Sequence, residues 1–380
     1  MGEMQSVSIC VYLWIYMGGA RVNKKERVMA AIEHREADRV PKGEVAIEYD
    51  FARALVGQPP NGVIGGQELP PYELNRRVHQ MLNMDLMVIG DWPRPQVGTT
   101  QEGYAILRDV WGRVMVDSGA STETIEYPIK DIHDAAHYQW PTVDTIPGDE
   151  LRWAVRETDY FTAGIINSVF EDVYNLIGFE RYMMILASEP ELLRPLAQKC
   201  AEFEVQKAYK FLDIGAEMIL IVEDIAHNTG TFISPRALRN EIFPYMKWQV
   251  AEIKRHRAVP VFFHSDGDLN TVLDDIVACG YEGLQSLQPS ANMDIARIKA
   301  QYGQRLCLMG NIDLNYVLTF GTPEEVERVV KETIRVAAPG GGYILSTCNT
   351  LIRAIPPANA LAMYRAGDKW GRYPIGDGND

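Results

Sequence analysis

The sequence predicts an α/β protein of the (β/α)8 TIM-barrel class, with an inserted β-hairpin and an N-terminal extension. Three observations support this fold class. Eight short apolar runs have the length and the flanking residues of buried strands, and segments with helical periodicity separate most of them. Polar side chains follow these runs, as expected where the parallel strands of a barrel end at its active-site face. A chain of 380 residues can also bury a core of the size that one barrel needs.

The composition narrows the class of protein and its partners. Hydrophobic residues make up 47% of the chain and charged residues 23%, which is typical of a soluble globular protein. The net charge of −14 argues against nucleic acids and anionic membranes as partners, because both attract basic patches. The five cysteines show no spacing that indicates a disulfide framework, so we expect a protein of the reducing cytoplasm. Self-association as a homodimer stays open.

The start of the chain differs in character from the rest. We predict an N-terminal extension over residues 1–22 and one barrel domain over residues 23–380. Residues 6–18 are apolar, but the run is shorter than the roughly 20 residues that cross a bilayer, and no basic segment precedes it. We expect an extra strand or arm packed on the body, or an unstructured start. A capping-box pattern from Asn23 to Glu26 begins the first helix.

The eight apolar runs are taken as the barrel strands in chain order. They span residues 40–47, 86–90, 162–166, 217–222, 259–263, 283–287, 305–309 and 342–345. Residues 103–116 alternate apolar and polar side chains around Trp111, which predicts the inserted hairpin. Residues 322–325 form a second capping box, with a proline at the first helical position, before an amphipathic helix.

Polar residues cluster directly after the predicted strands. They are Glu48, Asp91, Asn167, Glu223, Asp224, His264, Asp266, Asn311, Asp313 and Cys348. Imidazole, thiolate and carboxylate together form a zinc-binding set, and a catalytic zinc ion has about three protein ligands and one open position. We therefore predict a metal site made by His264, Cys348 and a carboxylate, either Asp266 or Glu223. Structural alternatives are a histidine that orders its loop, a buried inert cysteine and an aspartate in a turn.

Six segments carry a resemblance to a known group of proteins. They are residues 23–28, 38–41, 109–112, 264–267, 310–313 and 340–345. On these motifs the chain from about residue 23 onward resembles the uroporphyrinogen decarboxylase superfamily. The true decarboxylase carries an arginine-rich segment near its N-terminus that grips substrate carboxylates. In this sequence the matching region after Pro41 carries Glu44 and Glu48, which would repel a polycarboxylate substrate.

The cobalamin-dependent methyltransferases are the other branch that the chain resembles. In that branch a His-x-Cys pair after one strand and a cysteine after the last strand bind zinc. His264 and Cys348 match two of these positions, and Asp266 stands where the middle cysteine would be. The resemblance therefore implies a zinc ion with a more oxygen-rich ligand set. Such an ion would polarise an ether or alcohol oxygen as a Lewis acid.

These features lead to a prediction of function. We predict a zinc-dependent methyltransferase that moves a methyl group between a small methylated compound, such as an aryl methyl ether, and a corrinoid protein. The chain has no Asp-x-His-x-x-Gly motif, so a partner would supply the corrinoid. The residues assigned to catalysis are Glu223, Asp224, Asn167 and Asn311, and those assigned to substrate binding are Glu48, Asp91, Trp92 and Asp313. The alternatives are a decarboxylase acting on a less anionic substrate and a non-catalytic corrinoid- or tetrapyrrole-binding protein.

Overall fold

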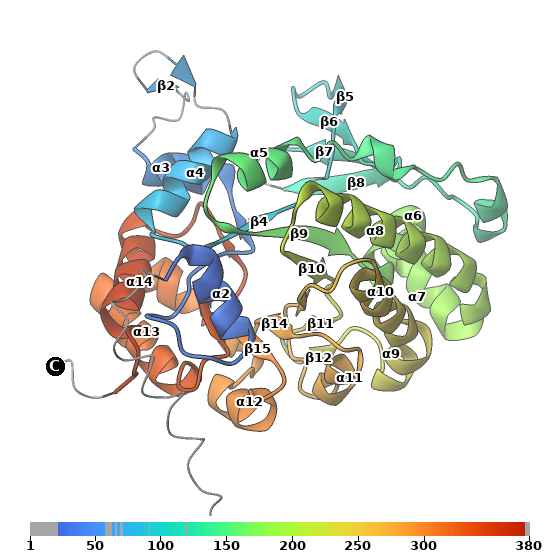
Figure 1. The fold of residues 1–380 in the computed structure, drawn as a ribbon. Helices are drawn as coiled ribbons and strands as arrows, with labels where there is room; N and C mark the ends of the chain where they lie inside the picture. The colour runs from blue at the N-terminus through green and yellow to red at the C-terminus, as the bar shows by residue number, and fades with distance from the viewer. Residues whose placement is uncertain are drawn as a thin grey trace, which may run out of the picture.

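A curved sheet of seven parallel strands forms the centre of the molecule (Figure 1). The computed structural model describes residues 22–57, 63–64, 67–68, 71–90, 92–118 and 121–376. In spatial order the strands are β16 (Tyr343–Thr347), β15 (Cys307–Ile312), β14 (Gly283–Ser286), β13 (Val261–His264), β10 (Met218–Val222), β9 (Phe161–Asn167) and β4 (Leu86–Ile89). Seven of the eight predicted strands are therefore confirmed within a few residues, and the fold is a TIM-barrel-like α/β fold.

The first predicted strand, over residues 40–47, closes the barrel with very little strand pairing. Lys42 forms a parallel bridge to Leu345 in β16, and the carbonyl of Lys42 accepts the N–H of Leu86 at the start of β4. The segment thus lies between the first and last strands of the seven. The pairing with β16 is short because the Glu44 carboxylate, and not a backbone carbonyl of this segment, accepts the N–H of Thr347. Downstream, β1 (Ala46–Ile47) leaves this position and pairs with β17 (Thr350–Leu351).

Helices surround the sheet in Figure 1. They are α2 (Lys24–Ile32), α3 (Tyr49–Leu55), α4 (Pro71–Met81), α5 (Asp149–Glu157), α6 (Val169–Ile177), α7 (Phe179–Ser188), α8 (Arg194–Ile214), α9 (Pro235–Glu241), α10 (Phe243–His256), α11 (Leu273–Ala278), α12 (Ile295–Tyr302), α13 (Pro323–Ala337) and α14 (Pro357–Trp370). Both predicted capping boxes are confirmed, at Asn23 before α2 and at Thr322 before α13. In the described residues no helix combines the length and apolar character that a membrane crossing needs.

Shorter helical turns connect several of these elements. They are the 3-10 helices η1 (Ile132–His137), η2 (Val143–Thr145), η3 (Pro190–Leu192) and η4 (Pro289–Ala291), and the π-helix η5 (Leu314–Leu318).

Alternating side chains of the strands build two hydrophobic layers. Leu220, Phe262 and Met309 belong to a cluster inside the barrel, whereas Ile221 and Phe263 pack in the larger cluster that includes the helices. Strands buried on both faces need apolar residues at every position, which explains their continuous apolar sequence. Polar residues can therefore enter only where these strands end.

A separate antiparallel sheet stands where the hairpin is predicted. It contains β5 (Gln96–Thr99), β6 (Ala105–Arg108), β7 (Val114–Asp117) and β8 (Thr122–Glu126) in sequential order. The predicted hairpin is its inner pair, β6 and β7, and one more strand extends each side. Two small hairpins complete the strands: β2 (Val63–Ile64) with β3 (Gln67–Glu68), and β11 (Ala226–His227) with β12 (Gly230–Thr231).

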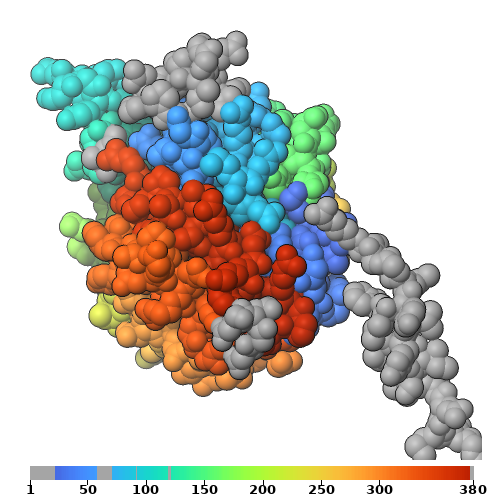
Figure 2. Space-filling model, turned by 90° about the vertical axis from the view of Figure 1, so that its left-hand side faces the viewer, coloured from blue at the N-terminus to red at the C-terminus, as the bar shows by residue number. Residues whose placement is uncertain are grey.

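The C-terminal helix packs beside segments from the beginning of the barrel, as the red and blue regions of Figure 2 show. The N–H of Val40 donates to Gly371, and the Lys42 ammonium group lies 2.7 Å from Asp368. Residues 1–21 of the predicted extension lie outside the described residues, and so does Asp91.

Candidate metal centre at the carboxyl-terminal end of the barrel

Three polar side chains meet at the ends of two neighbouring strands. His264 is the last residue of β13, Asp266 follows it, and Asp224 lies just beyond β10. One ligand atom from each side chain lies within 4.8 Å of the other two. His264 Nε2 is 3.8 Å from Asp224 Oδ1 and 4.0 Å from Asp266 Oδ1. Parallel pairing of Val222 with His264 sets this proximity, because it brings both strand ends to the same height.

A hydrogen-bond chain sets the tautomer of His264. The side-chain amide nitrogen of Gln285 donates to the Thr347 carbonyl at 3.2 Å, so its Oε1 faces His264 Nδ1 and accepts from it. Nδ1 therefore carries a proton, and Nε2 faces the two aspartates. Thr347 in turn is held by the buried carboxylate of Glu44, which accepts its N–H at 2.9 Å and its hydroxyl at 2.6 Å.

Asp266 is equally well fixed. Its Oδ1 accepts the Ser286 hydroxyl at 2.7 Å, its Oδ2 accepts the Asn349 amide, and its own N–H donates to Asp224 Oδ1 at 2.8 Å. Burial raises the pKa of Asp266, and His264 and the two side-chain donors oppose that shift. The carboxylate is thus oriented before any ligand arrives.

The backbone around the site takes conformations that side chains usually avoid. Ser286, Leu287 and Asn311 have positive φ angles of 95°, 55° and 74°. Gly267 has φ of 87°, and a Cβ there would lie 2.6 Å from the backbone of Ala226. Non-glycine residues at positive φ cost free energy and are concentrated at functional sites. The strained backbone at this end of the barrel therefore indicates a functional site.

The three side chains have the chemistry of a metal centre. Zinc ligands about 2.0–2.2 Å from the ion lie roughly 3.4 Å from one another in a tetrahedral site, close to the spacing seen here. One imidazole and two carboxylates are accepted zinc ligands, and three protein ligands leave one position for a substrate. Metal ligands commonly form hydrogen bonds to neighbouring residues that hold them in place. His264 has such a bond from Nδ1–H to Gln285, and Asp266 has them from Ser286 and Asn349.

Glu223, predicted as a ligand, does not belong to this group. Its Oε1 accepts the N–H of Glu171 at 2.6 Å at the start of α6, and its buried Oε2 has no hydrogen-bond partner. Burial raises the pKa of Glu223 well above its usual value, and the neighbouring Glu171 adds to the shift. The side chain points from the strand end toward the start of the helix and away from His264 Nε2.

Cys348 also stays outside the group of three. It follows β16 and is 1% exposed, and the Leu314 backbone hydrogen-bonds with it. Burial raises the pKa of the Cys348 thiol to about 12, whereas the contact with Leu314 opposes the shift. The third member of the group is therefore Asp224, whereas the sequence predicts Cys348.

The remaining predicted residues separate into two sets. Asn167 and Trp92 line a cavity next to the metal centre. Asn311, Asp313 and Glu48 instead serve the backbone: Asn311 donates to the Leu287 carbonyl, Asp313 accepts the N–H of Tyr316, and Glu48 accepts the N–H of Arg353.

Sequence reasoning missed several residues of this site. Gln285 and Glu44 lie on predicted strands, so their polar character among apolar neighbours was the available signal. Glu171 and Asp172 lie in the first turn of α6, where a carboxylate ordinarily only favours the helix dipole. No spacing in the sequence distinguishes them from such residues.

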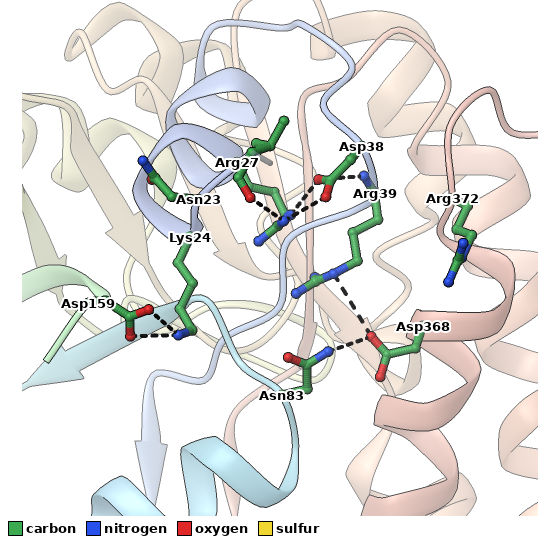
Figure 3. Close-up of a pocket in the computed structure, with 10 residues that line it drawn as sticks. Asn23, Lys24, Arg27, Asp38, Arg39, Asn83, Asp159, Asp368 and Arg372 are labelled. Carbon is green, nitrogen blue, oxygen red and sulfur yellow. Dashed lines mark hydrogen bonds and ion pairs between the residues drawn. The ribbon is translucent and has the colours of Figure 1, made fainter. Parts of the chain in front are cut away.

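A second polar pocket lies at the opposite, amino-terminal end of the barrel (Figure 3). Its volume is about 680 Å³, and most of its charges are arranged in pairs. Arg27 binds Asp38 through two hydrogen bonds of 2.6 and 2.7 Å, and Arg39 binds the fully buried Asp85. Polar groups that satisfy one another at this end of a barrel contribute to stability.

Comparison with known proteins places the site within a family. The family model described as Uroporphyrinogen decarboxylase (URO-D) matches residues 151–370, a range that contains Asp224, His264 and Asp266. Among curated proteins, a uroporphyrinogen decarboxylase of Chlorobaculum tepidum is 27% identical over 175 residues, 45% of this chain and 47% of the relative. Another from Alkalilimnicola ehrlichii is 27% identical over 264 residues, 63% of this chain and 67% of the relative. The match thus spans about half the length of the first relative.

A solved structure shares the fold over nearly the whole chain. It is a methyltransferase from Methanosarcina mazei, with a TM-score of 0.71 and 17% sequence identity. The alignment covers 91% of this chain and 98% of that protein.

Proposed function

This chain belongs to the uroporphyrinogen decarboxylase family, and from that premise we propose that it is a zinc-dependent methyltransferase. It moves a methyl group from a small methylated compound, such as an aryl methyl ether, to a corrinoid protein. The group formed by Asp224, His264 and Asp266 is the observation that carries the proposal. The overall likeness to a methyltransferase from Methanosarcina mazei is consistent with it.

The three residues would hold the ion through His264 Nε2 and one carboxylate oxygen each from Asp224 and Asp266. Zinc bound there would act as a Lewis acid on the oxygen that carries the methyl group. Gln285 keeps a proton on His264 Nδ1, so Nε2 is the ring nitrogen left to bind the ion. Ser286 and Asn349 hold Asp266 in one orientation, which lowers the entropy lost on binding.

The reaction balances as a substitution at carbon. The bond between oxygen and the methyl carbon breaks, oxygen keeps the electron pair, and the methyl carbon bonds to the acceptor. The oxygen stays on the donor, takes up one proton from water and becomes a hydroxyl group of the demethylated product, which leaves the site. A corrinoid carried by a partner protein is the proposed acceptor, because its reduced cobalt is a strong nucleophile for methyl groups.

The experiment measures zinc content and methyl transfer in the same preparations. Full-length protein purified without chelators is analysed for zinc and assayed with methoxybenzene and free cob(I)alamin. We expect one zinc ion per chain and transfer of the methyl group. The substitution His264→Ala should lower zinc content at least about tenfold and abolish transfer, whereas His137→Ala, which changes an exposed histidine, should alter neither. Retention of zinc and activity in His264→Ala would overturn the proposal.

A decarboxylase acting on a less anionic substrate is the second candidate. The names of the curated relatives favour it. The acidic residues at this end of the barrel, Glu44, Glu171, Asp224 and Asp266 among them, speak against a polycarboxylate substrate. Release of carbon dioxide by zinc-free protein, without methyl transfer by the zinc form, would decide for this candidate. Binding of a corrinoid without turnover of either kind would indicate a binding protein instead.

A further inference from the structure

A cavity of about 300 Å³ lies beside the metal centre. Its walls come from residues 92–94 after β4, from the turn between β6 and β7, from the ends of β9 and β10, and from the first turns of α6. The inserted sheet therefore contributes one side of the cavity and the barrel contributes the other.

Glu171 connects the cavity to the metal centre. Its side chain lines the cavity, and its Oε1 accepts the N–H of Asp224 at 3.4 Å. Val222, which pairs with His264, lines the cavity as well. A molecule in the cavity would thus have one end next to the proposed zinc ligands.

Two tryptophans give the cavity aromatic walls. The Trp92 ring packs over Gly90, where a Cβ atom would overlap it, and the Lys207 ammonium group lies 5.1 Å from the ring centre. Trp111 is 4% exposed and is held by Phe203, with ring centres 4.7 Å apart. The Trp111 indole is fixed by its surroundings, whereas Trp92 is 38% exposed, and a flat aromatic ligand gains from stacking on such surfaces.

Asp172 presents a buried polar atom without a partner at this cavity. Its Oδ1 accepts the Trp111 indole N–H at 3.2 Å and the Asn167 amide at 3.0 Å, whereas its Oδ2 has no hydrogen-bond partner. The side chain is fully buried. Burial raises the pKa of Asp172 well above its usual value, and Glu204 adds to the shift, whereas Asn167 and Lys207 oppose it.

Two arginines line the same cavity, and they differ in their partners. Arg113 is engaged by Asp109 at 2.9 Å and by Asn175. Arg94 has no hydrogen bond or ion pair to any of the described residues, although the charges of Asp109 and Asp117 act on it, and it is exposed. A cation in this position is available for an anionic group of a ligand.

We propose that this cavity binds the methyl donor and that the donor is a single-ring methoxylated aromatic carboxylate. Its ring contacts Trp92 and Trp111, its carboxylate binds Arg94, and its methoxy group faces Asp224. This inference rests on the proposed function for the role of the ligand. The cavity volume suits one substituted ring, since it is at the small end of the range for ligand pockets.

Calorimetric binding to the full-length protein, without an acceptor, tests this pocket directly. The probes are 3-methoxybenzoate and its uncharged counterpart 3-methoxybenzamide. Arg94→Ala should weaken benzoate binding about tenfold and change benzamide binding less than about twofold. Trp92→Ala should weaken both probes, and Trp92→Phe should restore most of the affinity. Arg328→Ala, which removes an exposed arginine of α13 that does not line the cavity, should leave both affinities unchanged.

Equal effects of Arg94→Ala on the two probes, or no binding of 3-methoxybenzoate, would overturn the pocket. These outcomes are separable from a failure of the proposed function. If binding depends on Arg94 but no methyl transfer occurs, the pocket assignment stands and the proposed methyltransferase activity is wrong. Methyl transfer from 3-methoxybenzoate that is unchanged in both Arg94→Ala and Trp92→Ala would support the enzyme and contradict the pocket.

Discussion

The two ends of the barrel differ in how completely their buried carboxyl groups are hydrogen-bonded. At the amino-terminal end, Asp85 is fully buried and receives hydrogen bonds from Arg27, Arg39 and the Lys42 backbone. At the carboxyl-terminal end, Asp172 and Glu223 are equally buried, and each has a carboxylate oxygen without a hydrogen-bond partner. One end compensates its charges, and the other leaves acids unpaired around a cavity.

The pKa directions of the acids at the two ends follow the same division. Burial would raise the pKa of Asp38, but the bonds and charge of Arg27 outweigh it, and the pKa is lowered. For Asp172 and Glu223 the hydrogen bonds that they accept, and at Asp172 the charge of Lys207, oppose burial without outweighing it, so their pKa values are raised. Buried polar groups without partners reduce stability, so they persist where a ligand or a reaction uses them. We infer that the amino-terminal end stabilises the fold and the carboxyl-terminal end carries the chemistry.

Removing Asp85 should produce the largest effect on stability. Asp85→Ala leaves Arg27 and Arg39 without a buried partner, which should lower the free energy of unfolding by about 3–5 kcal/mol. Urea denaturation measures this loss. The exposed pair of Lys199 and Glu202 provides the control, because Lys199→Met should change stability by less than about 1 kcal/mol. A similarly small change for Asp85→Ala would show that the ion pairs at the amino-terminal end do not stabilise the fold.

Gln285→Leu should act mainly on metal binding. It removes the acceptor that holds the proton on His264 Nδ1, so zinc affinity should fall about 10- to 100-fold while the protein stays folded. Competition with a chelating dye measures the affinity. Gln301→Leu, which makes the same change on the exposed face of α12, should bind zinc like the unmodified protein. Unchanged affinity in Gln285→Leu would show that the hydrogen bond does not prepare the ligand.

Asp172 should make the folded protein less stable as pH rises, whereas a carboxylate with a lowered pKa makes it less stable as pH falls. A raised pKa means that the folded state favours the protonated acid. Its contribution to stability is complete below about pH 4, the pKa of an unfolded aspartate, and is lost as pH rises through the folded value. Asp172→Asn cannot ionise and keeps the acceptor for Trp111, so it should gain on the order of 1 kcal/mol relative to the unmodified protein between pH 4 and pH 8.

Thermal unfolding at the two pH values measures this difference. The charged groups that act on Asp172 are Glu204, Lys207 and Glu171, and they are the same in both proteins. If the variant differs from the unmodified protein by the same amount at pH 4 and pH 8, Asp172 is ionised in the folded state.

The smallest effect on metal binding is expected for Cys348→Ala. The sulfur lies outside the group of Asp224, His264 and Asp266, so zinc affinity should change by less than about twofold. The same dye competition applies. A loss of tenfold or more would return Cys348 to the ligand set that the sequence predicts.

Most of the fold follows from patterns that the sequence displays. The strands buried on both faces appear as continuous apolar runs, and the caps at Asn23 and Thr322 define two helices. The closing segment at residues 40–47 was harder, because its length as a strand depends on bridges to residues some 300 positions away. The outer strands of the inserted sheet lack strong alternation, and only the inner hairpin was predicted.

The site was predictable to the extent that strand ends determine it. His264, Asp266 and Asp224 were all identified because they follow apolar runs. Asp224 was assigned to catalysis and Cys348 to the metal, since the sequence shows residue types but not the direction of a side chain. Asp172 stands out because its Oδ2 has no hydrogen-bond partner, and Arg94 stands out because it lines a cavity. Such properties arise from tertiary packing.

Zinc-edge X-ray absorption of the zinc-loaded protein tests the metal centre most directly. With Asp224, His264 and Asp266 as ligands, we expect one zinc ion per chain with only nitrogen and oxygen neighbours, at about 2.0–2.2 Å. One imidazole should contribute to the spectrum, and His264→Ala should remove it together with the ion. Absence of bound zinc, or a sulfur neighbour at about 2.3 Å, would contradict the proposed centre.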